Sequence, residues 1–140
     1  MASDIRQQVG KVMGLQKELR KKFGVLRNPD CDTPLLYGGV AESNLLEKIT
    51  PLVEGYFGKP YKSAGEGSFF KNLFDGFVKQ VGGVRKEQTL YRLDLTDSVR
   101  LYCAFWPWGS DPVKTTVRIG LFSTDEAEEE LLAKELADLF

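Results

Sequence analysis

Apolar and polar residues alternate between Leu90 and Phe122, which is the pattern of β-strands that pack one face against a core. The odd-numbered positions are nearly all apolar: Tyr91, Leu93, Leu95, Val99, Leu101, Cys103, Phe105, Val113, Val117, Ile119 and Leu121. We therefore predict an antiparallel meander of three strands whose odd face is buried. The connection from Trp106 to Pro112 contains two prolines, which we expect to exclude it from the hydrogen-bonded ladder.

The even-numbered positions of the same region differ, because they carry basic and aromatic side chains. They are Arg92, Asp94, Arg100, Tyr102, Trp106, Trp108, Lys114 and Arg118. Placing Leu95 opposite Val99 brings Leu93 opposite Leu101 in the core. The same register pairs Asp94 with Arg100, and Arg92 with Tyr102, on the outer face.

Helical spacing of apolar residues precedes and follows the meander. One helix is predicted from Ser3 or Asp4 to Phe23, ended by Gly24, and its Gly10 and Gly14 would permit close approach of another helix. A second pattern ends at Phe57, with Asn44 and Glu47 spaced as a capping box and Pro51 either kinking the helix or starting a new one.

Two further helices complete the predicted fold. One is expected from Ser68 to Val81, with a broad apolar face that packs on the sheet, and the last from Ser123, with Glu126 three positions later. Residues 1–140 thus predict a single α+β domain with about four helices around a three-stranded meander, in the order ααα-βββ-α. The sheet becomes four-stranded if Leu35–Tyr37 adds an edge strand.

The composition of the chain excludes several common kinds of catalytic and metal-binding site. The chain has no histidine, which removes the usual general base, the Ser-His and Cys-His nucleophile pairs and the commonest ligand of transition metals. Cys31 and Cys103 are expected to be free thiols, because the expected compartment is reducing and Cys103 falls on the apolar face of a strand. The two aspartates that flank Cys31 disfavour its thiolate, so we expect it to be a poor nucleophile. We predict no catalytic residue, no metal site and no cofactor.

Charge gives the chain no overall attraction to polyanions, because its formal net charge is −1. Basic residues gather in the first helix and acidic ones in the last, which indicates either that the two helices lie near each other or that both are solvated. No apolar run has the length of a signal peptide or a membrane span, so we expect a cytoplasmic protein without membrane contact.

The best functional lead is the even face of the meander together with the tryptophan-containing connection. The residues that we expect to contact a partner are Arg92, Arg100, Tyr102, Trp106, Trp108, Lys114 and Arg118. Arginine and tryptophan are typical of recognition surfaces, so the leading hypothesis is a non-enzymatic domain that binds a protein or a peptide. It requires these side chains to point outward and to be accessible.

Three alternatives stay open. The same face would suit single-stranded nucleic acid, with bases stacked on its aromatic rings and phosphates held by its arginines. A small enzyme without histidine would use the arginines to hold an anionic metabolite and Asp94 or Asp111 as base. Finally, a helix would cover part of the face, or Asp94, Arg100 and Arg118 would form a charge row that only keeps the sheet in solution.

Overall fold

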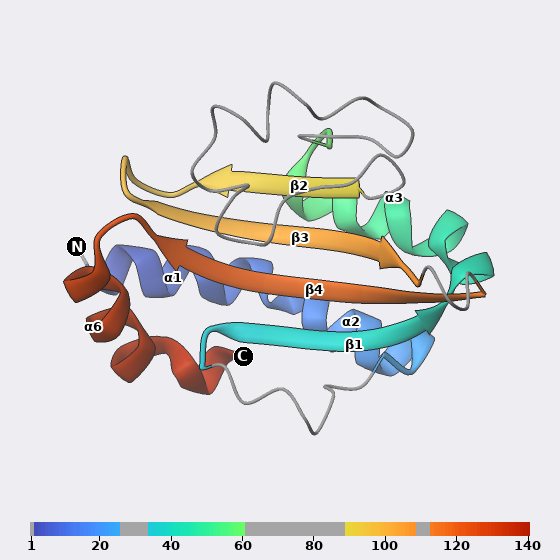
Figure 1. The fold of residues 1–140 in the computed structure, drawn as a ribbon, viewed down its shortest axis with the longest axis horizontal. Coiled ribbons are helices and arrows are strands. Elements are labelled where there is room, and N and C mark those ends of the chain that lie inside the picture. The colour runs from blue at the N-terminus through green and yellow to red at the C-terminus, as the bar shows by residue number, and fades with distance from the viewer. Residues whose placement is uncertain (1, 26–33, 61–88, 109–112) are drawn as a thin grey trace.

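Four antiparallel strands form one sheet in the order β1-β4-β3-β2 (Figure 1). The strands are β1 (Leu36–Glu42), β2 (Thr89–Asp94), β3 (Val99–Pro107) and β4 (Lys114–Ser123). The computed structural model describes residues 2–25, 34–60, 89–108 and 113–140. Its α+β class is the predicted one, and the expected edge strand is present as β1, longer than Leu35–Tyr37.

The pairing of β2 with β3 follows the register that the sequence predicts. Leu93 lies opposite Leu101, Arg92 opposite Tyr102, and Asp94 opposite Arg100. Strand β4 pairs with β3 on one side and with β1 on the other, so β1 and β2 are the two edges. The alternation of side chains along these strands then separates an odd face from an even face.

Helices cover the odd face. They are α1 (Ala2–Val12), α2 (Gly14–Phe23) and α3 (Leu46–Phe57), which lie behind the sheet in Figure 1. Helix α6 (Glu126–Leu136) lies at the end of the sheet where β1 begins, and its Leu132 and Leu136 join the same core. Burial of apolar side chains from both layers is the main force that holds them together.

The N-terminal part forms two helices where the sequence predicts one. Helix α1 ends at Val12 and α2 begins at Gly14, whose missing side chain lets α3 approach. A Cβ atom on Gly14 would lie 3.1 Å from the Tyr56 hydroxyl, so the predicted close approach of another helix is confirmed there. At Gly10 the prediction is wrong, because no atom of a described residue would lie within 4 Å of an added Cβ. Gly24 ends α2 in the left-handed conformation, with φ of 66°, as expected of a C-terminal glycine.

Two of the predicted helix starts are wrong. Asn44 does not cap α3, because a 3-10 turn (Ser43–Leu45) comes first. Ser43 is held by its amide to the Val113 carbonyl and by its hydroxyl to Thr115 of β4. Helix α3 then runs through Pro51 without a new start there. Ser123 is the last residue of β4, so Asp125 caps α6 instead, by accepting a hydrogen bond from the Glu128 amide.

The β3–β4 hairpin is longer than predicted. Trp106 and Pro107 belong to β3, with Pro107 opposite Thr115. The Trp108 amide donates to the Lys114 carbonyl, so the even-numbered residues at this end of β3 form the hydrogen-bonded pairs with β4. Pro107 occupies a non-hydrogen-bonded pair, and its missing amide hydrogen therefore costs no hydrogen bond to β4. Val113 was expected in the core but is 66% exposed, because it lies in the connection between β3 and β4, just before β4 begins.

The first and last helices lie near each other, which was one of the two alternatives. The Arg6 guanidinium donates to both carboxylate oxygens of Asp138, at 3.1 and 2.7 Å, and to the Glu135 carbonyl at 2.8 Å. The helix predicted at Ser68–Val81 lies outside the described residues. Within the described part of the chain, no helix has the length and apolar character needed to cross a bilayer.

Candidate binding surface

The register of the sheet places the predicted binding residues on its even face in cross-strand rows. One row runs from Arg92 through Tyr102 and Gly120 to Leu36. The next row runs through Ala104, Arg118 and Gly38, and the one after it through Trp106, Thr116 and Val40. Figure 1 shows α1, α2 and α3 on the other side of the sheet, so the even face is not the face that these three helices bury.

Arg92 and Arg100 form a charge cluster at one edge of this face. Asp94 lies 3.0 Å from Arg92 Nε and 3.2 Å from Arg100 Nε, and the two arginine side chains are only 16% and 21% exposed. The expected pair of Asp94 with Arg100 is thus present, but Arg92 completes the cluster and Arg118 lies elsewhere. Because one carboxylate engages both guanidinium groups, this edge offers less positive charge than the sequence indicates.

The centre of the even face is apolar and buried. Leu90, Tyr102, Ala104 and Phe122 form a second hydrophobic cluster, with Leu36 and Trp106 packed against it. Tyr102 is only 8% exposed, so the expectation that its ring projects into solvent is wrong. The physical reason lies opposite it: Gly120 has no side chain, and the ring fills the space above that glycine.

Each tryptophan of the hairpin carries a cation over its ring. Arg118 Cζ lies 4.4 Å from the centre of the Trp106 ring, and Lys114 Nζ lies 5.3 Å from that of Trp108. Both distances are within the range of cation–π attraction. Trp108 also donates from Nε1 to the Thr116 hydroxyl at 2.8 Å. We call Trp106, Trp108, Lys114, Thr116 and Arg118 the tryptophan patch.

Two further features distinguish the tryptophan patch. Trp106 Nε1 is buried and has no hydrogen-bond partner among the described residues, which is uncommon for an indole donor. In addition, two of the exposed large apolar residues adjoin the patch, since Val40 lies opposite Thr116 and Val113 precedes Lys114. Val40 is 37% exposed and Val113 is 66% exposed.

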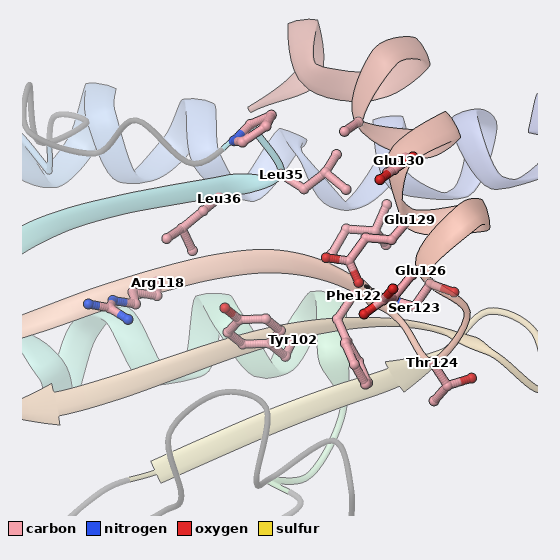
Figure 2. A pocket seen from close by; sticks show the side chains of 13 residues that line it. Leu35, Leu36, Tyr102, Arg118, Phe122, Ser123, Thr124, Glu126, Glu129 and Glu130 are labelled. Atoms are coloured by element: carbon pink, nitrogen blue, oxygen red, sulfur yellow. Dashed lines mark hydrogen bonds between the residues drawn. The ribbon is translucent and has the colours of Figure 1, made fainter.

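A groove of about 760 Å³ lies at the opposite end of the even face, between the start of β1 and α6 (Figure 2). Leu36, Tyr102 and Phe122 line its middle, as the labelled sticks show. Arg118 lies at one end, and Glu126, Glu129 and Glu130 of α6 lie at the other. The groove therefore has a cationic end, an apolar middle and an acidic end.

The carboxylates near α6 have different partners. Glu129 accepts a hydrogen bond from the Ser123 amide at 3.2 Å, where β4 extends past the start of β1. Glu128 accepts from the Ser98 and Ser123 hydroxyls. The carboxylates of Glu126 and Glu130, in contrast, form no hydrogen bond or ion pair with any residue that the structure describes.

Sequence reasoning missed this groove. The acidic residues of α6 indicated only a solvated or paired helix, since nothing local places them beside the sheet. Leu36 and Phe122 have even numbers and so belong to the predicted even face, which was the available signal. Their convergence with α6 depends on β1 beginning at Leu36, opposite Gly120 of β4, which only the tertiary structure fixes.

Of the two residues considered as a catalytic base, Asp94 is engaged by two arginines, and Asp111 lies outside the described residues. Cys103 is fully buried in the core, and burial raises the pKa of its thiol, which disfavours the nucleophilic thiolate. Comparison of the chain with models of protein families, with characterised proteins and with solved structures finds no match.

Proposed function

We propose that this protein is a non-enzymatic binding domain that recognises a protein or peptide through the tryptophan patch. The observation that carries the proposal is the pair of stacked cations, Arg118 over Trp106 and Lys114 over Trp108, on one face of a hairpin. Tryptophan and arginine are enriched among the residues that dominate binding energy at interfaces. The ring contacts also hold the cations in place, so less side-chain entropy is lost on binding.

A protein or peptide suits this surface better than a nucleic acid. The patch combines its two cations with the exposed apolar side chains of Val40 and Val113, a mixture typical of protein interfaces. Arg92 and Arg100 are engaged by Asp94, and three glutamates line the adjoining groove. A polyanion would meet those carboxylates, and the net charge of −1 adds no general attraction.

The proposal is tested by partner capture with a variant that removes one half of the patch. Trp108→Ala combined with Lys114→Glu changes the hairpin end and leaves the groove residues intact. Immobilised wild-type protein and variant are exposed to a lysate of the native host, and bound proteins are quantified by mass spectrometry. We expect the partner of the wild type to be recovered about tenfold less with the variant, since loss of a hot spot costs more than about 1 kcal/mol.

A control substitution tests whether any exposed apolar side chain would have the same effect. Leu131→Ala removes a side chain that is 53% exposed on α6, outside the patch and the groove. Recovery with this control should equal that of the wild type. Equal recovery with the patch variant, or no protein specifically enriched by the wild type, would contradict the proposed function. Thermal unfolding of all three proteins confirms that they are folded.

A further inference from the structure

The groove beside α6 has the two opposite charges of a dipolar site at its two ends. Arg118 lies at one end, stacked on Trp106, and forms no ion pair with a described residue. When a guanidinium stacks on a ring through its flat face, its N–H donors at the edge stay free to form two parallel hydrogen bonds with one carboxylate. At the other end Glu126 and Glu130 are available to a cation.

The spacing of these ends defines the length of the ligand. Arg118 and Phe122 are four residues apart on β4, which is about 14 Å of extended chain at about 3.4 Å per residue. An extended peptide with an acidic residue at position i, beside Arg118, has its residue i+4 level with Phe122, and a basic side chain there extends toward the acidic end of the groove. Its residue i+2 falls over Leu36 and Tyr102, which lie on either side of Gly120.

The acidic end fits an organic cation better than a metal ion. Within the described ranges, no three acidic or cysteine side chains are arranged to hold a metal ion. Glu129 is already engaged by the Ser123 amide, which leaves the separate carboxylates of Glu126 and Glu130. A lysine or arginine side chain suits such an arrangement, because its long apolar stem can lie along the groove while its charged end reaches the helix.

We propose that the groove binds an extended peptide segment with an acidic residue, an apolar residue and a basic residue at alternate positions. The acidic residue lies at Arg118, the apolar residue at Leu36 and Tyr102, and the basic residue at Glu126 and Glu130. This inference rests on the proposed function, because it specifies the kind of segment that a partner presents beside the tryptophan patch. The two sites share Arg118, but Trp108 and Lys114 belong only to the tryptophan patch and Glu126 and Glu130 only to the groove, so substitutions at these residues test the two separately.

The test uses three synthetic heptapeptides and the full chain labelled with ¹⁵N. The first is Gly-Asp-Ser-Leu-Ser-Lys-Gly with both ends blocked, and the other two replace its lysine by glutamine or its aspartate by asparagine. Backbone amides of Phe122 and Thr124 report on the groove, and the indole signal of Trp108 reports on the far end of the tryptophan patch. We expect the charged peptide to shift the groove amides with a Kd about fivefold lower than either neutralised peptide, the effect of about 1 kcal/mol.

A matched pair of variants tests the assignment of the acidic end. Glu126→Gln with Glu130→Gln should weaken binding of the lysine peptide about fivefold and leave the glutamine peptide unchanged, as a double-mutant cycle requires. Glu47→Gln with Glu135→Gln changes the charge equally, away from the groove, and should bind as the wild type does. Equal binding of the three peptides, an unchanged lysine peptide in the groove variant, or no amide shift up to about 2 mM peptide would overturn the inference.

The two proposals fail in different ways. If the Trp108→Ala, Lys114→Glu variant still captures the cellular partner while the groove variant does not, the groove stands and the tryptophan patch is rejected. If the patch variant loses the partner but the peptides bind without preference for charge, the proposed function stands and the dipolar groove is rejected.

Discussion

The ring of Tyr102 lies so close to Gly120, its partner across β3 and β4, that a Cβ atom at position 120 would come within 2.5 Å of the ring. Such a distance is shorter than any ordinary contact between carbon atoms. The glycine therefore provides the space that lets an even-numbered tyrosine lie flat on the sheet and become part of a second hydrophobic cluster. This relationship explains why the even face is apolar at its centre and polar at its ends.

Replacing this glycine should destabilise the sheet. Gly120→Ala is expected to lower the free energy of unfolding by about 1–3 kcal/mol, the usual cost of inserting a methyl group into a packed site. Gly38→Ala is the matched control, because its nearest neighbour would be Arg118 Cγ at an ordinary 3.7 Å. Urea unfolding of both variants checks the prediction. Equal stabilities for the two alanine variants would show that the Tyr102 ring moves aside without cost.

The contact of Arg118 with Trp106 should be visible in fluorescence. In a Trp108→Phe background the emission comes from Trp106 alone. Removing the guanidinium by Arg118→Ala exposes the ring face that it covers at 4.4 Å, so quenching by acrylamide should increase. Lys114→Ala in the same background should leave quenching unchanged, since Lys114 covers the other tryptophan. Equal quenching in all three proteins would mean that the cation does not stack in solution.

The Tyr91 hydroxyl should cause the free energy of unfolding to fall as the pH rises into the alkaline range. Burial first, and its hydrogen bond to Glu54 second, raise the pKa of Tyr91 above its ordinary value. A group with a raised folded pKa stabilises the protein fully below its unfolded pKa, about 10 for tyrosine, and this contribution declines as the pH rises toward the folded value. Unfolding free energies between about pH 8 and about pH 11 should therefore fall more steeply for the wild type than for Tyr91→Phe.

Tyr91→Phe should also cost stability at neutral pH. Loss of the hydrogen bond to Glu54, 2.9 Å long, is worth about 0.5–1.5 kcal/mol. The aromatic contacts of this ring with Phe57 and Phe105 remain, which keeps the substitution conservative. Parallel pH profiles for the two proteins would contradict the prediction, because they would place the alkaline transition on other groups.

The ion pair between the first and last helices should weaken in acid. The hydrogen bonds from Arg6 lower the pKa of the Asp138 carboxyl in the folded protein. A lowered folded pKa gives stability above the unfolded value, about 3.9 for aspartate, and that stability is lost as the pH falls through the folded value. Asp138→Asn should therefore be less stable than the wild type near about pH 7 and equally stable near about pH 2.

Two details decide whether that result belongs to the ion pair. Arg6 also donates to the Glu135 carbonyl, so the helices stay connected in the variant and only part of the interaction is lost. Asp97→Asn removes an exposed carboxylate without an ion pair among the described residues and should show no such difference at either pH. A deficit of Asp138→Asn that persists in strong acid would indicate a cause other than charge.

The sequence predicted the sheet well and the helix ends poorly. Leu93 opposite Leu101 and Asp94 opposite Arg100 followed from alternation, since a shift by one residue would turn every apolar side chain into solvent. Helix boundaries depend on which polar side chain can accept from the free amides at the start of the helix. Tertiary contacts of the neighbouring strands determine which side chain that is. Ser123 remained in β4, so Asp125 caps α6. Ser43 stays bound to β4, so Asn44 caps nothing.

The sequence alone thus determined which residues share a face, because that depends only on the two-residue period of a strand. Whether a side chain on that face is accessible was decided by the tertiary structure. Tyr102 and Arg118 both lie on the even face, yet one fills the space over a glycine and the other stacks on a tryptophan. The groove forms where β1, β4 and α6 come together. Contacts between segments that are far apart along the chain produce no local sequence pattern, so the sequence alone could not predict it.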